Sequence, residues 1–82
     1  MNELGTNVLK VMEGSSLGRM SVYVLSKQSS DLGLDLNTLD PNGVVKLSTK
    51  LKTVLPFFLG EETDEVLIQI RKIANGDNVV MI

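Results

Sequence analysis

The stretch DLNTLDPNG repeats acid and amide oxygens in the manner of a calcium-binding loop. An EF-hand loop needs oxygen ligands at positions 1, 3 and 5, a glycine at position 6 and a glutamate at position 12. Counted from Asp35, the residue at position 5 is Leu39 and the residue at position 12 is Lys46. Neither side chain is the required ligand, so the stretch predicts a turn followed by a capped helix and no metal site.

The stretch EGSSLGRM carries the residue types of an anion site at the start of a helix. Ser15 and Ser16 supply hydroxyl groups, and Arg19 supplies a positive charge. The stretch lacks the Gly-Lys-Ser/Thr ending of a phosphate-binding P-loop. A tight turn between two helices uses the same glycine and serines, and we favour that structural interpretation over an anion site.

Three lysines lie on the solvent face of the predicted third helix, with no acid among them: Lys46, Lys50 and Lys52. Lys46 and Lys50 share one side of the helix, whereas Lys52 points away from them. Such a face can contact phosphate groups or an acidic partner. No arginine or aromatic residue is interleaved to read bases or stack on them, and the net charge of −2 disfavours general nucleic-acid binding. The hydroxyl residues of this face are Ser48, Thr49 and Thr53.

The composition narrows the chemistry that is open to the chain. The sequence contains no cysteine, histidine or tryptophan. Without cysteine and histidine, a zinc or iron–sulfur site has no usual ligands, and the usual general base near neutral pH is missing. We therefore expect a protein that is not an enzyme and that binds no cofactor and no metal.

Apolar residues recur at the three- and four-residue spacing of amphipathic helices along most of the chain. With 82 residues, of which 43% are hydrophobic, the chain is large enough for one domain, residues 1–82, around one core. The prediction is an all-α fold, a compact bundle of four short helices with an ordered loop at residues 31–40 and a short apolar C-terminal tail. The helices are expected at residues 2–13, 16–30, 41–59 and 62–75, the third kinked at Pro56.

Local signals indicate where these helices begin. Asp40 can accept backbone N–H bonds as the N-cap of the third helix, and Pro41 suits its first turn. Ser15 or Ser16 can cap the second helix, whose inward face is expected to include Met20. The acidic stretch EETDE opens the fourth helix and needs no ligand, because acids are favourable at the positive end of the helix dipole. The tail NVVMI is expected to pack against its own core rather than to add a strand to a partner's sheet.

The stretch PFFLG contains both phenylalanines and Pro56, which interrupts the third helix. If the helix continues beyond the kink, Phe58 falls on the apolar stripe and is expected in the core. Phe57 points about 100° away from Phe58 and is expected to be an anchor for a partner. Replacing Phe58 with alanine is then expected to cost about 3–5 kcal/mol. The stripe consists of Val44, Leu47 and Leu51.

Three further large apolar side chains have no place in the predicted stripes: Leu9, Tyr23 and Ile68. Several exposed apolar residues in one small protein favour a protein–protein surface, and self-association is the commonest kind. The leading prediction is a small non-enzymatic helical protein–protein interaction module, a homodimer or a small subunit of a larger assembly. Its candidate partner contacts are Phe57, Ile68 and Tyr23. The alternative is a nucleic-acid-binding protein that uses the lysine face of the third helix.

The N-terminal stretch MNELGTN lacks the basic and apolar regions of a signal peptide. No apolar run approaches the roughly 20 residues that span a bilayer. The sequence therefore favours a cytoplasmic protein with no membrane partner.

Overall fold

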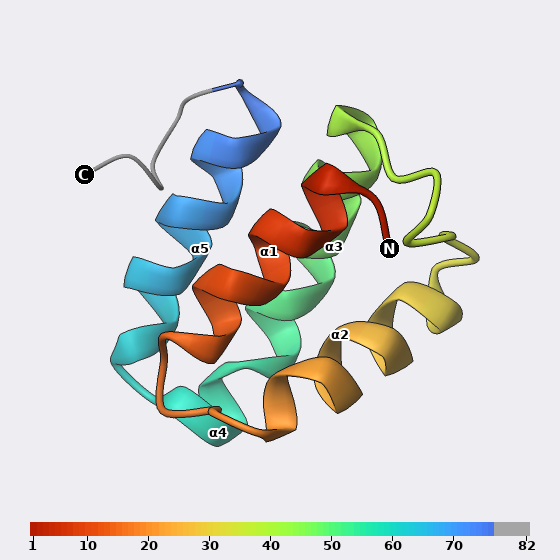
Figure 1. Cartoon of the computed structure of the whole chain (residues 1–82). Helices are drawn as coiled ribbons and strands as arrows, with labels where there is room; N and C mark the ends of the chain where they lie inside the picture. Colours follow the sequence, from red (N-terminus) through yellow and green to blue (C-terminus); the bar gives the residue numbers. More distant parts are fainter. Residues whose placement is uncertain (77–82) are drawn as a thin grey trace.

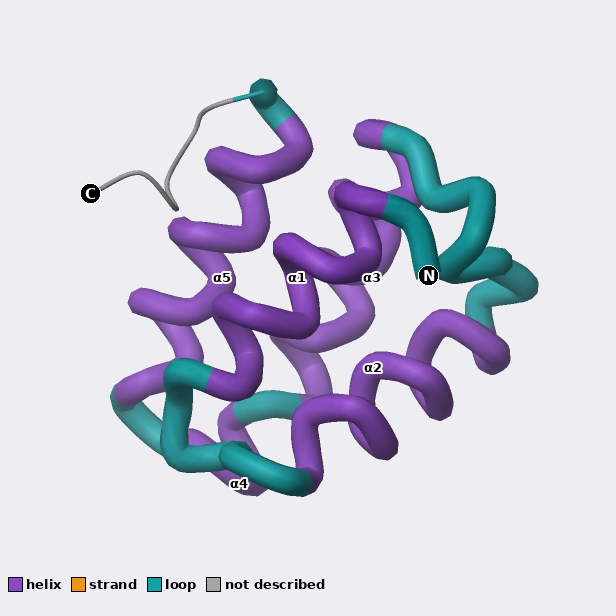
Figure 2. The backbone as a smooth tube through the Cα atoms, viewed as in Figure 1, coloured by secondary structure: helices purple, strands orange, loops and turns teal. Residues whose placement is uncertain are grey.

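Five helices form in the part of the chain that the computed structural model describes, residues 1–76. They are α1 (Glu3–Glu13), α2 (Met20–Asp31), α3 (Pro41–Val54), α4 (Pro56–Leu59) and α5 (Glu62–Ala74). Turns and loops connect them, and no strand occurs among the described residues (Figure 1 and Figure 2). The predicted all-α bundle is confirmed. The apolar tail predicted at the C-terminus, residues 78–82, lies outside the described residues.

The longest helix, α3, packs closely against α5, and α1 lies against both (Figure 1). α2 packs against α1 and α3. The buried hydrophobic core between these helices consists of valine, leucine, isoleucine and methionine side chains only. Its members are Val8, Met12, Leu17, Val24, Leu25, Leu39, Val44, Leu47, Leu51, Leu55, Val66, Leu67, Ile70 and Ile73. Because burial of one such side chain contributes about 1.5–3 kcal/mol, this core is the main source of stability.

α1 and α3 begin in the same way, with a polar side chain that accepts a backbone N–H bond. Asn2 Oδ1 accepts from the amide of Gly5 at 3.0 Å. Asp40 Oδ1 accepts from the amide of Gly43 at 2.7 Å, and Pro41 occupies the first turn of α3. Because amides of a first turn have no partner within the helix, these bonds fix where each helix starts. The predicted start of the third helix is confirmed.

The loop between α2 and α3 is ordered, as predicted, and it covers part of the core. Its Leu39 is buried, and its other leucines are half-buried against the core. Asn2 holds the loop through two bonds, from its backbone nitrogen to the carbonyl oxygen of Leu36 at 2.8 Å and from Nδ2 to the carbonyl oxygen of Leu39 at 2.9 Å. A Cβ atom on Gly5 would lie 3.1 Å from the Leu36 carbonyl oxygen. The absent side chain of this glycine therefore permits the close approach of α1 to the loop.

The second helix begins later than predicted. The segment between α1 and α2 forms turns, and α2 starts at Met20 without a side-chain cap. Ser15 Oγ instead accepts from the amide of Leu17 at 3.2 Å, within one of these turns. Gly18 then adopts a φ of 50°, which lies outside the right-handed helical region. The caps predicted at Ser15 or Ser16 are therefore wrong.

The inward face of α2 is centred on polar residues. Ser21, Gln28 and Ser29 are buried there, beside two apolar side chains. Met20 points about 100° away from Ser21 and is 45% exposed, so its predicted inward place is wrong. Among the described residues, the two hydroxyl groups and the Gln28 side-chain oxygen have no hydrogen-bond partner. Because buried polar groups without partners destabilise a fold, we expect α2 to stabilise the bundle less than α1, α3 or α5.

α1 buries a wider face than predicted, because it contacts α2, α3 and α5 together. Val8 and Met12 are buried, as expected from their helical spacing. Leu9 was expected to lie off the apolar stripe, but it is half-buried and packs against the core. Leu9 is therefore covered, contrary to the prediction from the sequence.

The kink predicted at Pro56 is confirmed, and it separates α3 from α4. Leu55 joins the two helices with helical backbone angles, φ −61° and ψ −32°, and its side chain is fully buried. Pro56 has no N–H group to donate, and the carbonyl oxygen of Leu55 accepts from the amides of Phe58 at 2.9 Å and Leu59 at 2.7 Å. Gly60 ends α4 with a φ of 56°, which a residue with a side chain rarely adopts.

Candidate functional site

The aromatic side chains lie on the surface of this protein. Phe57, Tyr23 and Phe58 are 88%, 65% and 50% exposed, respectively. These three are all the aromatic residues of the sequence. Phenylalanine is among the residue types that are most often buried, yet the core is filled by aliphatic side chains alone. The aromatic groups are therefore available for contacts outside the fold.

α4 presents two of these aromatic side chains from a fixed backbone. The helix packs against α3 and α5 (Figure 1). Leu59 is half-buried against the core, and no side chain of α4 is fully buried. The amide of Gly60 donates to the carbonyl oxygen of Pro56 at 3.2 Å and closes the turn. The three residues before Leu59 are all exposed, so α4 presents them to solvent.

The core position expected for Phe58 is wrong. A straight helix would carry the apolar stripe of α3 from Leu51 on to Phe58, but the chain changes direction at Pro56. Leu55, directly before the break, is fully buried and completes the stripe, whereas Phe58 is 50% exposed. Phe57 is exposed, as its spacing predicts.

The two other candidate contacts come from different helices. Ile68 is 55% exposed on the outer face of α5. A hollow of about 250 Å³ lies beside it, lined by Lys52, Asp64, Leu67, Ile68 and Arg71. Tyr23 belongs to α2, whose main packing partners are α1 and α3. The structure thus distributes the predicted contacts over three helices, with α4 and α5 packed against each other.

The three predicted lysines do not form one surface. Lys46 and Lys50 line a hollow of about 460 Å³ together with Leu32 and Val45. Lys52 lines the other hollow, beside α5. This separation is the one expected from the helical spacing of 100° per residue. A ligand of the first hollow would meet two positive charges around a partly apolar surface.

The hydroxyl groups near these lysines are largely occupied within α3. Ser48 is buried and donates to the carbonyl oxygen of Val45 at 2.8 Å, so its expected place on the solvent face is wrong. Thr49 donates to the same oxygen at 3.1 Å, and Thr53 donates to the carbonyl oxygen of Lys50 at 2.7 Å. The protons of these hydroxyls are therefore already committed to backbone acceptors.

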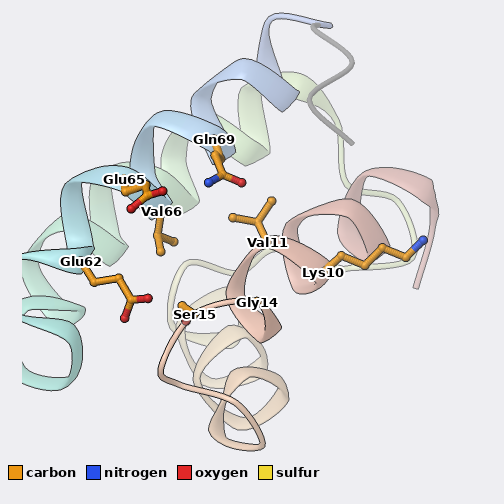
Figure 3. Close-up of a pocket in the computed structure, with 8 residues that line it drawn as sticks. All are labelled: Lys10, Val11, Gly14, Ser15, Glu62, Glu65, Val66 and Gln69. Atoms are coloured by element: carbon orange, nitrogen blue, oxygen red, sulfur yellow. The ribbon is translucent and has the colours of Figure 1, made fainter. Parts of the chain in front are cut away.

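A hydrogen bond joins the turn after α1 to the first turn of α5. The backbone nitrogen of Ser16 donates to Oε1 of Glu62 at 3.0 Å. A hollow of about 150 Å³ lies next to this bond, and Figure 3 shows Glu62 and Glu65 on one side of it and Val11 on the other. Ser15 donates its hydroxyl to the carbonyl oxygen of Met12. A carboxylate of the chain itself thus accepts from the backbone nitrogen of Ser16, which agrees with the tight turn favoured over an anion site.

One ion pair is present among the described residues, between Lys27 and Asp31 on α2. Lys27 Nζ lies 2.9 Å from Oδ1 of Asp31, and both side chains are exposed. The hydrogen bond from Lys27 is the main cause that lowers the pKa of Asp31, and it raises the pKa of Lys27. Lys50 adds a smaller lowering effect on the pKa of Asp31. Asp31 directly precedes Leu32, which lines the same hollow as Lys46 and Lys50, so a negative charge lies near these lysines.

The described part of the chain has neither a metal-ligand cluster nor a membrane-spanning helix. Residues 1–76 contain no group of three or more acidic, histidine or cysteine side chains arranged to hold a metal ion. Over the same residues, no helix combines the length and the apolar character needed to cross a membrane. In the stretch that resembles a calcium loop, Asp35 accepts from the amide of Asn37 at 2.8 Å and Asp40 caps α3.

Comparison with known proteins gives no relative for this chain. No protein-family model matches it, and no curated protein or solved structure is detectably similar to it.

Proposed function

We propose that this protein is a small non-enzymatic helical module that binds another protein, either as a homodimer or as a small subunit of a larger assembly. The observation that carries the proposal is the exposure of every aromatic side chain around an entirely aliphatic core. Aromatic residues are enriched at the centres of protein interfaces, where they contribute much of the binding energy. The cytoplasmic location stays a prediction.

α4 is the element best suited to this role. Phe57 and Phe58 are adjacent, and both are at least half exposed. Full burial of one phenylalanine in a partner's pocket contributes roughly 1.5–3 kcal/mol. The backbone of α4 is held by α3 and α5, so little ordering of the chain is needed when a partner binds. We therefore place the main anchor at Phe57.

Affinity capture from the source cells with matched baits tests the proposal. The baits are the wild-type protein, Phe57→Ala and, as the control, Glu13→Ala, which changes an exposed residue at the end of α1. The expected result is a protein that wild type and the control retain equally and that Phe57→Ala retains at least about tenfold less, the loss typical of a hot-spot anchor. Equal retention by all three baits would contradict the role of Phe57.

A second candidate function is nucleic-acid binding, and one observation favours it. Lys46 and Lys50 border a hollow large enough to receive a polar group. A phosphate there would meet two ammonium groups. Retention on DNA or RNA that falls steeply with salt, and that is lost in the double variant Lys46→Ala, Lys50→Ala, would favour this function over the first. Retention that is unchanged in the double variant would exclude this hollow as the site.

A further inference from the structure

The outer face of α5 carries charges in an order that is complementary to itself. Ile68 lies in the middle of this face and is 55% exposed. At 100° per residue, Asp64 and Arg71 lie on one edge of the face, and Glu65 and Lys72 lie on the other. All four charged residues are exposed. Each edge thus has an acid in its first half and a base in its second half. We define Asp64, Glu65, Ile68, Arg71 and Lys72 as the α5 face.

The acids and bases of the α5 face are too far apart to neutralise one another within the helix. The two charges on each edge are seven residues apart, which corresponds to about 10 Å along the axis. Helical ion pairs form at spacings of three or four residues. The ion pair found among residues 1–76 joins Lys27 and Asp31 on α2, and none involves the α5 face. The helix dipole explains why acids precede bases, but it does not require an exposed isoleucine between them.

We infer that the α5 face binds the α5 face of a second copy of this chain, with the two helices antiparallel about a two-fold axis at Ile68. Rotation about this axis places each edge of the face beside the same edge of the second copy. It also reverses the direction of the helix, so the first half of one helix meets the second half of the other. Asp64 then faces Arg71 of the second copy, and Glu65 faces Lys72. With both copies counted, four acid–base pairs form. A parallel arrangement would place acid against acid, so the charges select the antiparallel one.

The surroundings of Ile68 fit a second copy of the same helix. Figure 1 shows α5 at one edge of the bundle, with α1 and α3 to one side of it. The hollow of about 250 Å³ between α5 and the end of α3 is lined in part by Leu67 and Ile68. Ile68 of the second copy can lie against these apolar groups, with Lys52 at the rim. An isologous contact of this kind closes as a dimer and does not propagate into a filament.

This inference rests on the proposed function and names the partner of one surface. The contact is small, because one helix face meets one helix face, so we expect a weak and salt-sensitive dimer. Sedimentation equilibrium of the wild-type protein up to millimolar concentration should show a dimer whose dissociation constant rises as NaCl is raised. A wild-type protein that stays monomeric throughout this range would overturn the inference.

Charge reversal provides a test whose expected result, association of two variants that associate only weakly alone, cannot arise from unfolding. The basic variant is Asp64→Lys, Glu65→Lys, and the acidic variant is Arg71→Glu, Lys72→Glu. Each alone should associate at least about tenfold more weakly than wild type, since like charges then face each other. An equimolar mixture of the two should form a heterodimer at least as tight as the wild-type dimer. A mixture in which both variants stay monomeric, or single variants that dimerise as wild type does, would overturn the inference.

Self-association through the α5 face and partner capture through Phe57 of α4 are tested independently. Phe57→Ala should leave self-association unchanged, because it alters no residue of the α5 face. If the α5 face does not self-associate while capture still depends on Phe57, the inference is wrong and the proposed function stands. If the charge variants behave as expected while capture does not depend on Phe57, the dimer stands and the role of α4 is wrong.

Discussion

The amide nitrogen of Phe58 donates a hydrogen bond of 2.9 Å to the carbonyl oxygen of Leu55, yet the two side chains of this turn have opposite environments. Leu55 is fully buried, whereas Phe58 is 50% exposed. Pro56 between them ends the regular bonding of α3 and turns the chain. The core therefore closes on a leucine before the proline, and both phenylalanines are left on the surface.

Leu55→Ala is expected to lower the free energy of unfolding by about 2–5 kcal/mol, because it removes a fully buried side chain and leaves a cavity. Phe58→Ala is expected to lower it by about 1 kcal/mol or less, because half of that side chain already contacts solvent. Urea unfolding of both variants, followed by circular dichroism, measures the difference. A larger decrease in the free energy of unfolding for Phe58→Ala than for Leu55→Ala would show that Phe58 is buried in the core.

Most of the helices could be predicted from the sequence because their inward faces are aliphatic at regular spacing. α5 is an example: Val66, Leu67, Ile70 and Ile73 repeat every three or four residues, and all four are buried. α3 is similar, and Asp40 before Pro41 marks its first turn through a side-chain cap. Hydrophobic periodicity and a side-chain cap indicate these features, and both can be read from a single sequence.

The remaining features depend on packing between elements. The face of α2 that points inward is centred on Ser21 and Gln28, which no hydrophobic pattern identifies. Pro56 turns the chain, and α4 then packs against α5, so the apolar stripe of α3 does not extend to Phe58. In the candidate site, the exposure of Phe57 and Ile68 was predictable from helical spacing. The burial of Ser48, which separates it from the exposed lysines, depends on how α3 packs and was not predictable.

Asn2→Ala is expected to lower the free energy of unfolding by about 1–3 kcal/mol, since it removes an N-cap bond to Gly5 and a side-chain bond to the loop carbonyl of Leu39. Asn37→Ala is the matched control. It changes an exposed asparagine of the same loop whose side chain makes no hydrogen bond among the described residues. Thermal unfolding compares the two variants. Equal melting temperatures would show that Asn2 does not tie α1 to the loop.

Ser21→Ala is expected to leave stability unchanged or to raise it by about 0.5–1 kcal/mol. The Ser21 hydroxyl is buried without a hydrogen-bond partner among residues 1–76, and alanine is the better helix former. Ser48→Ala is the control, because Ser48 is equally buried but its hydroxyl donates to Val45. Guanidinium unfolding should rank Ser21→Ala as the more stable variant. The reverse order would mean that Ser21 has a partner in solution.

The Lys27–Asp31 pair is expected to make a small contribution to stability that depends on pH. The pKa of Asp31 is lowered in the folded protein, so its contribution is present above the unfolded pKa, near 4, and is lost as the pH falls through the folded pKa. The pKa of Lys27 is raised, so its contribution is present below its unfolded pKa and is lost as the pH rises through the folded value.

Unfolding of wild type and Asp31→Asn between about pH 2 and pH 7 measures this dependence. The stability difference between them should shrink below about pH 4 and also shrink in high salt, because both side chains are exposed. Glu13→Gln, which removes an exposed acid outside any ion pair of the described residues, serves as the control. A difference that is constant over this pH range would exclude the pair as its cause.

The most direct test of the central claim, that α4 presents Phe57 to another protein, is photo-crosslinking in the source cells. A benzophenone amino acid replaces Phe57 in one version of the protein and Glu13 in the control version, and both positions are exposed. We predict one discrete protein adduct at position 57, which is absent at position 13 and is reduced when Phe58 is also changed to alanine. The same adduct pattern at both positions, or no adduct at position 57, would contradict the claim.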